Sequence, residues 1–165
     1  SRLVKLVEGT NASVCDTRKT LPGLRALEKY AVLMGGGRNH RFNLSDAAML
    51  KDNHIDAYGG IIPAVSKLRE RIGHMVKIEV ETRSLDEVRQ ALQCGAEVIM
   101  LDNMSCAEMS EAVAIGRGRA LFEASGNITE ENIRNVAETG VDIISVGALT
   151  HTVKAFDISM RIAKD

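Results

Sequence analysis

The sequence predicts a parallel α/β barrel, and three observations support this fold class. Apolar runs alternate with amphipathic stretches, which is typical of strand–helix units around a parallel sheet buried on both faces. Polar or charged residues follow nearly every apolar run, as expected where the carboxyl ends of barrel strands open on one functional face. A length of 165 residues suits one domain, over residues 1–165, with a substantial core.

Six apolar runs are the predicted strands. Each is short and nearly continuously apolar, as strands covered on both faces are. They span residues 12–17, 47–51, 76–81, 97–102, 120–125 and 142–146. Any one polar strand end could be a cap or a solvated turn. Six such ends in one barrel instead predict a single active-site mouth.

The segments between the strands are predicted to be helices, because they carry start and stop signals. Pro22 suits the first turn of a helix that runs into the triple glycine of residues 35–37. Gly95 and Gly140 lie where helix C-caps would fall. Capping-box spacing marks two further helix starts, Ser84 with Glu87 and Ser105 with Glu108.

Composition excludes several classes of function. A net charge of −1, with only two tyrosines, three phenylalanines and no tryptophan, does not favour nucleic-acid binding. No apolar run approaches the 18 residues that would suggest a membrane span. Three sparse cysteines without a CxxC pair fit reduced thiols in a cytoplasmic protein. Residues 1–9 read like the middle of a helix, so we expect the chain to be part of a longer protein.

Residues 16–54 concentrate positive charge in a chain that is otherwise more acidic. They contain DTRKTLPG, MGGGRNHR and MLKDNH. Arginine forks and lysine point charges set at turns predict a pocket for a small anion with several charges, such as a phosphate or a carboxylate. The cations of this stretch are Arg18, Lys19, Arg38, His40, Arg41, Lys51 and His54. Arg38 and His54 are the weaker candidates and are left out of the predicted site.

Alternatives stay open for some of these cations. Arg18 and Lys19 directly follow a strand and are poor candidates for mere surface charge. A solvated loop would equally explain His40 and Arg41 after the triple glycine. A side chain reaching toward water from a strand end would explain Lys51.

Glycine turns follow the last two predicted strands. One consists of Ser125, Gly126 and Asn127, before a helix expected to open at Thr129. The other contains Ser145, Val146, Gly147 and Ala148. Backbone N–H groups at such turns bind phosphate, and barrels often place a phosphate site after their last two strands. The alternative is that both glycines are only caps.

The chain resembles the quinolinate phosphoribosyltransferase family. The matching segments are long, keep the family's order and span nearly the whole chain: DTRKTLPGLRALEKYAV, GGGRNHRFNLSDAAMLKDNHI, KIEVET, AEVIMLDN, FEASGNI and DIISVGALTH. The resemblance implies an open α/β barrel of the type II phosphoribosyltransferase kind. It also implies conversion of quinolinate and phosphoribosyl pyrophosphate to nicotinate mononucleotide, carbon dioxide and pyrophosphate, with magnesium, in NAD biosynthesis.

The resemblance also implies roles for particular residues. Quinolinate contacts fall on Arg18, Lys19, His40 and Arg41, and the phosphate end falls on the two glycine turns. Lys51 would face the pyrophosphate or a substrate carboxylate. Lys51, Glu81 and Asp102 are the expected catalytic residues, and these two carboxylates are candidate magnesium ligands.

The two carboxylates can also be interpreted from their positions. Glu81 and Asp102 end successive strands and should be neighbours. Carboxylates suit ribose hydroxyls, magnesium, or the positive charge expected at the anomeric carbon in the transition state. Glu79 lies on the same strand face as Glu81 and could share its role.

The resemblance implies partners as well. The family adds an N-terminal sandwich domain, which is not found in these residues. It forms homo-oligomers, dimers or hexamers, in which a neighbouring subunit supplies an arginine to the site. The barrel alone could therefore be inactive.

Two other functions stay open. A related phosphoribosyltransferase acting on another base, nicotinate or the base of the molybdenum-operon homologue, should need fewer cations for a monoacid. A non-catalytic phosphate-binding barrel could keep the glycine turns and lose Lys51, Glu81 and Asp102, all of which are present here.

Overall fold

The computed structural model describes residues 1–154 and 157–163. In these ranges the chain forms a single sheet in the order β1-β6-β5-β4-β3-β2, and all neighbouring strands are parallel. The strands are β1 (Ser13–Cys15), β2 (Ala48–Leu50), β3 (Ile78–Thr82), β4 (Val98–Asp102), β5 (Leu121–Ser125) and β6 (Ile143–Ser145). All six predicted strands are confirmed; each is shorter than expected, and β3 ends one residue later than predicted, at Thr82.

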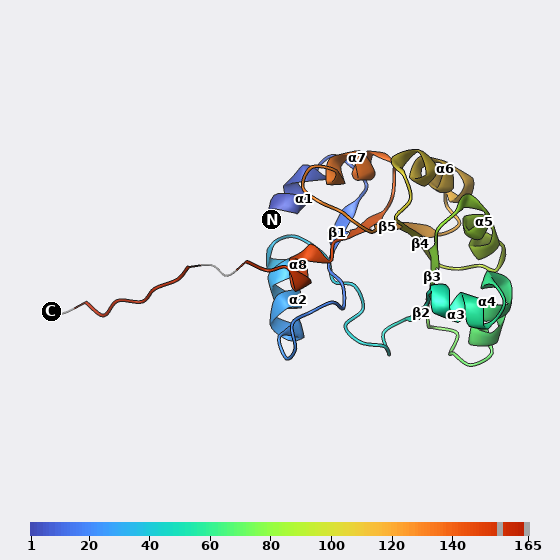
Figure 1. The fold of residues 1–165 in the computed structure, drawn as a ribbon, viewed down its shortest axis with the longest axis horizontal. Coiled ribbons are helices and arrows are strands. Elements are labelled where there is room, and N and C mark those ends of the chain that lie inside the picture. Colours follow the sequence, from blue (N-terminus) through green and yellow to red (C-terminus); the bar gives the residue numbers. More distant parts are fainter. Residues whose placement is uncertain (155–156, 164–165) are drawn as a thin grey trace.

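The sheet curls into an open barrel with helices on its outer side (Figure 1). Its edges, β1 and β2, do not pair with each other in the described part of the chain. Arg38 partly covers the free edge of β1 through an isolated parallel bridge to Cys15. Its N–H donates to the Val14 carbonyl at 2.8 Å, and its carbonyl accepts from the Asp16 N–H at 3.2 Å. The predicted open parallel barrel is therefore confirmed.

Side chains alternate along each strand between the helices and the interior of the curl. Ile78, Val80, Ile99 and Leu101 face the helices and belong to one buried apolar core. Their neighbours on the other face of the sheet are largely polar and include buried Glu79. The hydrophobic core therefore lies between the sheet and the helices, and largely polar side chains face the interior of the barrel.

The helices within the described residues are α1 (Arg2–Leu6), α2 (Arg25–Met34), α3 (Asp52–Ala57), α4 (Ile61–Arg69), α5 (Leu85–Gln93), α6 (Cys106–Gly116), α7 (Ile133–Glu138) and α8 (Ala148–His151). Two predicted starts are displaced. Pro22 lies in a turn before α2, which begins at Arg25. Likewise α7 begins at Ile133, because the Thr129 N–H donates to the Asn132 side chain at 2.8 Å and closes a turn first.

The predicted caps are largely confirmed. Ser105 and Glu108 form the complete capping box of α6. At α5 only half of the box forms, because the Glu87 carboxylate accepts from the Arg83 N–H instead, at 2.6 Å. Gly95 and Gly140 directly follow the C-caps of α5 and α7, with φ of +71° and +92°.

Helix α2 has its polar face inward and its apolar face outward. Within the described chain, Lys29 is the single buried residue of α2. Leu27, Tyr30 and Met34 are 67%, 60% and 66% exposed. Most surface helices pack against the rest of the protein through an apolar stripe, whereas α2 packs through its polar face.

All three cysteines lie in the described residues and are unpaired, and burial raises the pKa of the Cys15 and Cys94 thiols. Among the described residues no helix is long and apolar enough to cross a membrane.

Candidate active site

The carboxyl ends of the strands surround one cavity of about 960 Å³. Its wall contains all but one of the residues predicted to form the site. Those present are Arg18, Lys19, His40, Arg41, Lys51, Glu81, Asp102, Ser125, Gly126, Asn127, Ser145 and Gly147.

Val146 is the exception, and the structure does not support a ligand contact there. Strand β6 ends at Ser145, so alternation turns Ser145 toward the cavity and Val146 toward the helices. The Val146 side chain is 2% exposed, and its backbone N–H donates to the Cys15 carbonyl at 2.9 Å. The Val146 side chain is therefore part of the core, and its backbone N–H is already used in a hydrogen bond of the fold.

Two layers of strand residues face the interior of the curl, because alternate positions on a strand point to the same side. The upper layer lies at the strand ends and consists of Glu81, Asp102 and Ser125. The lower layer lies two residues earlier on the same strands and consists of Glu79, Met100 and Glu123. The cavity is therefore acidic at its rim and acidic again beneath it.

Lys51 follows β2 and points to the upper layer. Its Nζ lies 3.2 Å from Oε2 of Glu81, and the lysine side chain is half exposed. The Lys51 N–H donates to the His54 ring at 3.0 Å, so His54 caps α3 and stays outside the cavity wall. Lys51 thus presents its charge between Glu81 and open solvent.

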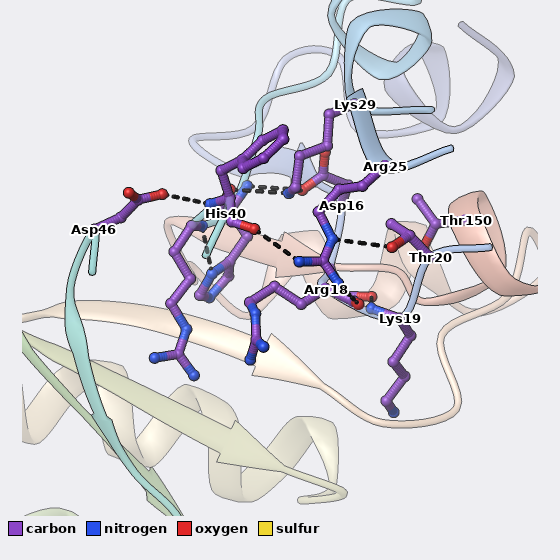
Figure 2. Close-up of polar contacts among 12 residues, drawn as sticks. Asp16, Arg18, Lys19, Thr20, Arg25, Lys29, His40, Asp46 and Thr150 are labelled. Carbon is purple, nitrogen blue, oxygen red and sulfur yellow. Dashed lines mark hydrogen bonds and ion pairs between the residues drawn. The ribbon is translucent and has the colours of Figure 1, made fainter. Parts of the chain in front are cut away.

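Two loops carry the remaining cations, and Figure 2 shows them side by side. The first cation loop, residues 17–20, follows β1 and bears Arg18. The second cation loop, residues 38–42, bears Arg41. Nε of Arg18 is buried without a hydrogen-bond partner among the described residues.

Arg41 is held by neutral atoms. Its guanidinium donates to the Ala47 carbonyl at 3.2 Å and to the Met49 sulfur at 3.1 Å. Burial lowers the pKa of Arg41, and the positive charge of Arg18 lowers it further. Neither guanidinium pairs with a carboxylate in the described residues. Two adjacent guanidinium groups without a counter-ion are what a multiply charged anion would require.

His40 points away from this pair, into the lower layer. Its Nε2 lies 3.2 Å from Glu79 and 3.5 Å from Glu123. Its Nδ1 accepts the Arg41 N–H at 2.8 Å. Both ring nitrogens are therefore engaged with protein, so the expected donation from the His40 ring to a substrate carboxylate has no free N–H in this arrangement.

The His40–Glu79–Glu123 cluster also resembles a metal site, since three ligand atoms lie within 4.8 Å of one another. The hydrogen bond at Nδ1 argues against a metal. A ring nitrogen that accepts an N–H carries no hydrogen, so in the neutral ring the hydrogen is on Nε2, which then cannot ligate. We read the cluster as hydrogen-bonded.

The cluster retains a proton. Burial lowers the pKa of His40, but its hydrogen bonds to Glu123 and Glu79 outweigh this effect and raise the pKa to about 10. Burial also raises the pKa of Glu79. Because Nδ1 accepts the Arg41 N–H, the retained proton lies on the Nε2 side of the ring, between His40 and the carboxylates of Glu79 and Glu123.

The glycine turn after β5 is locked by asparagines. Gly126 has a φ of +96°, and a Cβ there would collide with the Asn103 amide. Asn103 donates to Asp102 at 2.9 Å, and Asn127 donates to Asn103 at 3.0 Å. This turn therefore demands glycine for both conformation and space.

The turn after β6 differs from expectation. Gly147 has a φ of −62°, so glycine is not needed there for its conformation. A Cβ would lie 2.7 Å from Nε2 of His151, the far end of a flexible side chain. Gly147 therefore leaves room for His151, a cavity residue that the sequence analysis did not single out.

We expect Gly126→Ala to weaken binding of a phosphate ligand about tenfold or more, because the new methyl group displaces Asn103 from the turn that faces the cavity. The control is Gly118→Ala, which shares the positive φ (+76°) but meets nothing within 4 Å. Calorimetric titration of both variants checks this. Equal affinities in the two variants would remove the Gly126 turn from the site.

The fold and this cavity define a class of protein: an open parallel α/β barrel with a cation-rich cavity at the carboxyl ends of its strands. Within that class, the family model "Quinolinate phosphoribosyl transferase, C-terminal domain" matches residues 1–161, and the chain belongs to this family.

Relatives agree in sequence and in structure. The chain is 48% identical over 159 residues to a probable nicotinate-nucleotide pyrophosphorylase [carboxylating] of Bacillus subtilis, covering 96% of this chain and 55% of that protein. It is 46% identical over 180 aligned positions to the chloroplastic Arabidopsis thaliana protein of that name, covering 97% and 52%. The nicotinate-nucleotide pyrophosphorylase structure from Francisella tularensis superposes with a TM-score of 0.92 at 47% identity, covering 96% and 56%. The chain thus spans about half the length of these relatives.

Proposed function

We propose that the complete protein transfers the phosphoribosyl group of phosphoribosyl pyrophosphate to quinolinate with decarboxylation, in NAD biosynthesis. The products are nicotinate mononucleotide, carbon dioxide and pyrophosphate. The observation that carries the proposal is the arrangement of one cavity: Arg18 and Arg41 have no carboxylate partner among the described residues, while Glu81 and Asp102 stand at neighbouring strand ends. Family membership and the names of the relatives support it.

Quinolinate carries two adjacent carboxylates, and the two guanidinium groups supply paired donors for them. Lys19, beside Arg18, adds a point charge. In the proposed reaction the bond from the anomeric carbon to pyrophosphate breaks and a bond from that carbon to the pyridine nitrogen forms. The ring nitrogen is then cationic, and its charge stabilises the electron pair left on the adjacent ring carbon when the carboxylate there departs as carbon dioxide. A proton replaces that carboxylate.

The strand-end carboxylates suit the other half of the reaction. Positive charge develops at the anomeric carbon as pyrophosphate leaves, and Glu81 and Asp102 can stabilise it. Lys51, 3.2 Å from Glu81, can meet the departing pyrophosphate. The 5′-phosphate is assigned to the turns at Gly126 and Gly147, where backbone is open to the cavity.

Magnesium fits this donor set. Magnesium commonly takes one or two carboxylates together with phosphate oxygens, and Glu81 and Asp102 present theirs to the cavity. When bound, the ion would neutralise charge on the pyrophosphate.

The complete protein is proposed to be a cytoplasmic homo-oligomer, a dimer or a hexamer, with an additional N-terminal domain and with an arginine from a neighbouring subunit at the site. Its proposed partners are the two substrates, without nucleic acid or membrane. Some relatives are named as chloroplastic or mitochondrial proteins, so location varies among them.

The deciding experiment incubates the complete protein with phosphoribosyl pyrophosphate, magnesium and quinolinate labelled in its 2-carboxylate. We expect labelled carbon dioxide and nicotinate mononucleotide in equal amounts. Nicotinate in place of quinolinate should give no product. Turnover of nicotinate alone would favour the related transferase, and binding of phosphate ligands without turnover would favour the non-catalytic barrel.

A further inference from the structure

We propose that Arg25 and Lys29 of α2 are positioning residues that hold the two cation loops in register for substrate binding. The inference rests on the proposed function, since it concerns the same site. Arg25 and Lys29 are four residues apart and therefore lie on one face of the helix. That face is turned toward the loops (Figure 2). Neither residue lines the cavity among the described residues.

Arg25 bridges the two loops with a single guanidinium. It donates to the Arg18 carbonyl of the first loop at 3.2 Å and to the Phe42 carbonyl of the second loop at 3.2 Å. Its Nε donates to the Thr20 hydroxyl at 3.0 Å. The planar fork of an arginine can satisfy three such acceptors in a fixed geometry, which a lysine cannot.

Lys29, together with Asp16, holds the backbone of the second loop at His40. Its Nζ lies 2.5 Å from Oδ1 of Asp16 and donates to the His40 carbonyl at 3.0 Å. The same Asp16 oxygen accepts the His40 N–H at 2.8 Å. The other oxygen accepts from the Asn39 amide at 2.7 Å, in the orientation that satisfies that side chain. Both backbone groups of His40 are therefore held by one buried ion pair.

The arrangement is a weak source of stability compared with an apolar stripe. Removing two charges from water offsets much of their attraction, and a well-packed apolar pair can be as stable. What the charged groups add is positional specificity, because each of their hydrogen bonds fixes one particular backbone atom of a loop. Those atoms belong to Arg18 itself, to His40 beside Arg41, and to Phe42 on the other side of Arg41. Helix α2 thus sets the distance between the guanidinium groups of Arg18 and Arg41, which are proposed to bind the substrate.

The test compares Arg25→Met and Arg25→Lys with Arg134→Met in the complete protein. Arg134 is a matched control, because it also donates from a helix to two backbone carbonyls, those of Leu6 and Glu8, and none of these residues is in the cavity wall. We expect Arg25→Met to raise the KM for quinolinate about tenfold to a hundredfold, the scale of a small misplacement of binding groups. The KM for phosphoribosyl pyrophosphate should stay within about twofold, because the groups proposed to bind it lie at other strand ends. Arg25→Lys should not rescue quinolinate, and Arg134→Met should change neither KM.

Amide hydrogen exchange without any ligand gives a second reading. In Arg25→Met, residues 17–20 and 38–42 should exchange faster, and in Arg134→Met they should not. Unchanged exchange in Arg25→Met would overturn the inference, whatever the protein's substrate. So would an equal rise in both KM values, or full rescue by lysine. If the loops loosen as expected but wild-type protein does not turn quinolinate over, the proposed function fails and the positioning role stands.

Discussion

Lys29→Met is expected to lower the free energy of unfolding by about 3–5 kcal/mol, the usual cost of removing one partner from a buried ion pair. Lys29 is 2% exposed and Asp16 is fully buried, so the variant leaves a carboxylate without its counter-charge and away from water. Urea unfolding of both proteins, followed by circular dichroism, measures the difference.

Lys67→Met is the matched control. Lys67 lies 2.6 Å from Glu70, almost the same separation, but both side chains are about half exposed. The surface pair should contribute no more than about 1 kcal/mol. Adding Asp16→Asn to Lys29→Met should recover part of the loss, because the remaining group is neutral. A Lys29 variant as stable as the Lys67 variant would show that the pair is not desolvated as the structure has it.

Asp102→Asn and Glu81→Gln are each expected to reduce kcat about 100- to 1,000-fold, with little change in substrate affinity. Both substitutions keep shape and remove negative charge. If the carboxylates stabilise charge that exists only in the transition state, the loss falls on kcat, on the scale seen when one electrostatic group is removed from an active site. Steady-state kinetics of the complete protein with both substrates provides the measurement.

The control for these variants is Asp86→Asn on α5, which removes the same charge from an 86% exposed side chain. It should leave both constants unchanged. A rise in the KM for phosphoribosyl pyrophosphate with kcat nearly intact would instead assign the carboxylates to ribose or magnesium in the ground state. No change in either constant would refute both roles.

Much of the fold and the cavity wall could be predicted from the sequence, because both follow from periodicity. Parallel strands that end in polar residues must bring those residues together, which accounts for Glu81, Asp102 and Ser125. Alternation would also have corrected Val146, once β6 was known to end at Ser145. Glu123 carried the same signal, since it precedes Ser125 by two residues, but it lies within a strand rather than at its end.

The contacts of α2 could not be predicted. A helix with leucines and a tyrosine on one face is expected to bury that face, whereas here the lysine is buried and Leu27 is 67% exposed. Lys29 is buried because it pairs with Asp16 after β1, and that pairing is a tertiary fact. The pairing of His40 with Glu79 and Glu123 is tertiary in the same way, which is why His40 was expected to serve as a free cation.

The pairing of β1 with β6 bears on the order of folding. Ser13 contacts Asp142 across 129 residues of sequence, so β1 cannot join the sheet until nearly the whole described chain has been synthesised. Such distant pairings are slow to form, because the entropy cost of closing a long loop comes before the stabilising contacts are made. The middle strands, β3 to β5, pair with sequence neighbours and can assemble first. Strand β1 and the loop that carries Arg18 would then leave the ribosome before the other five strands and be among the last segments to reach their native place.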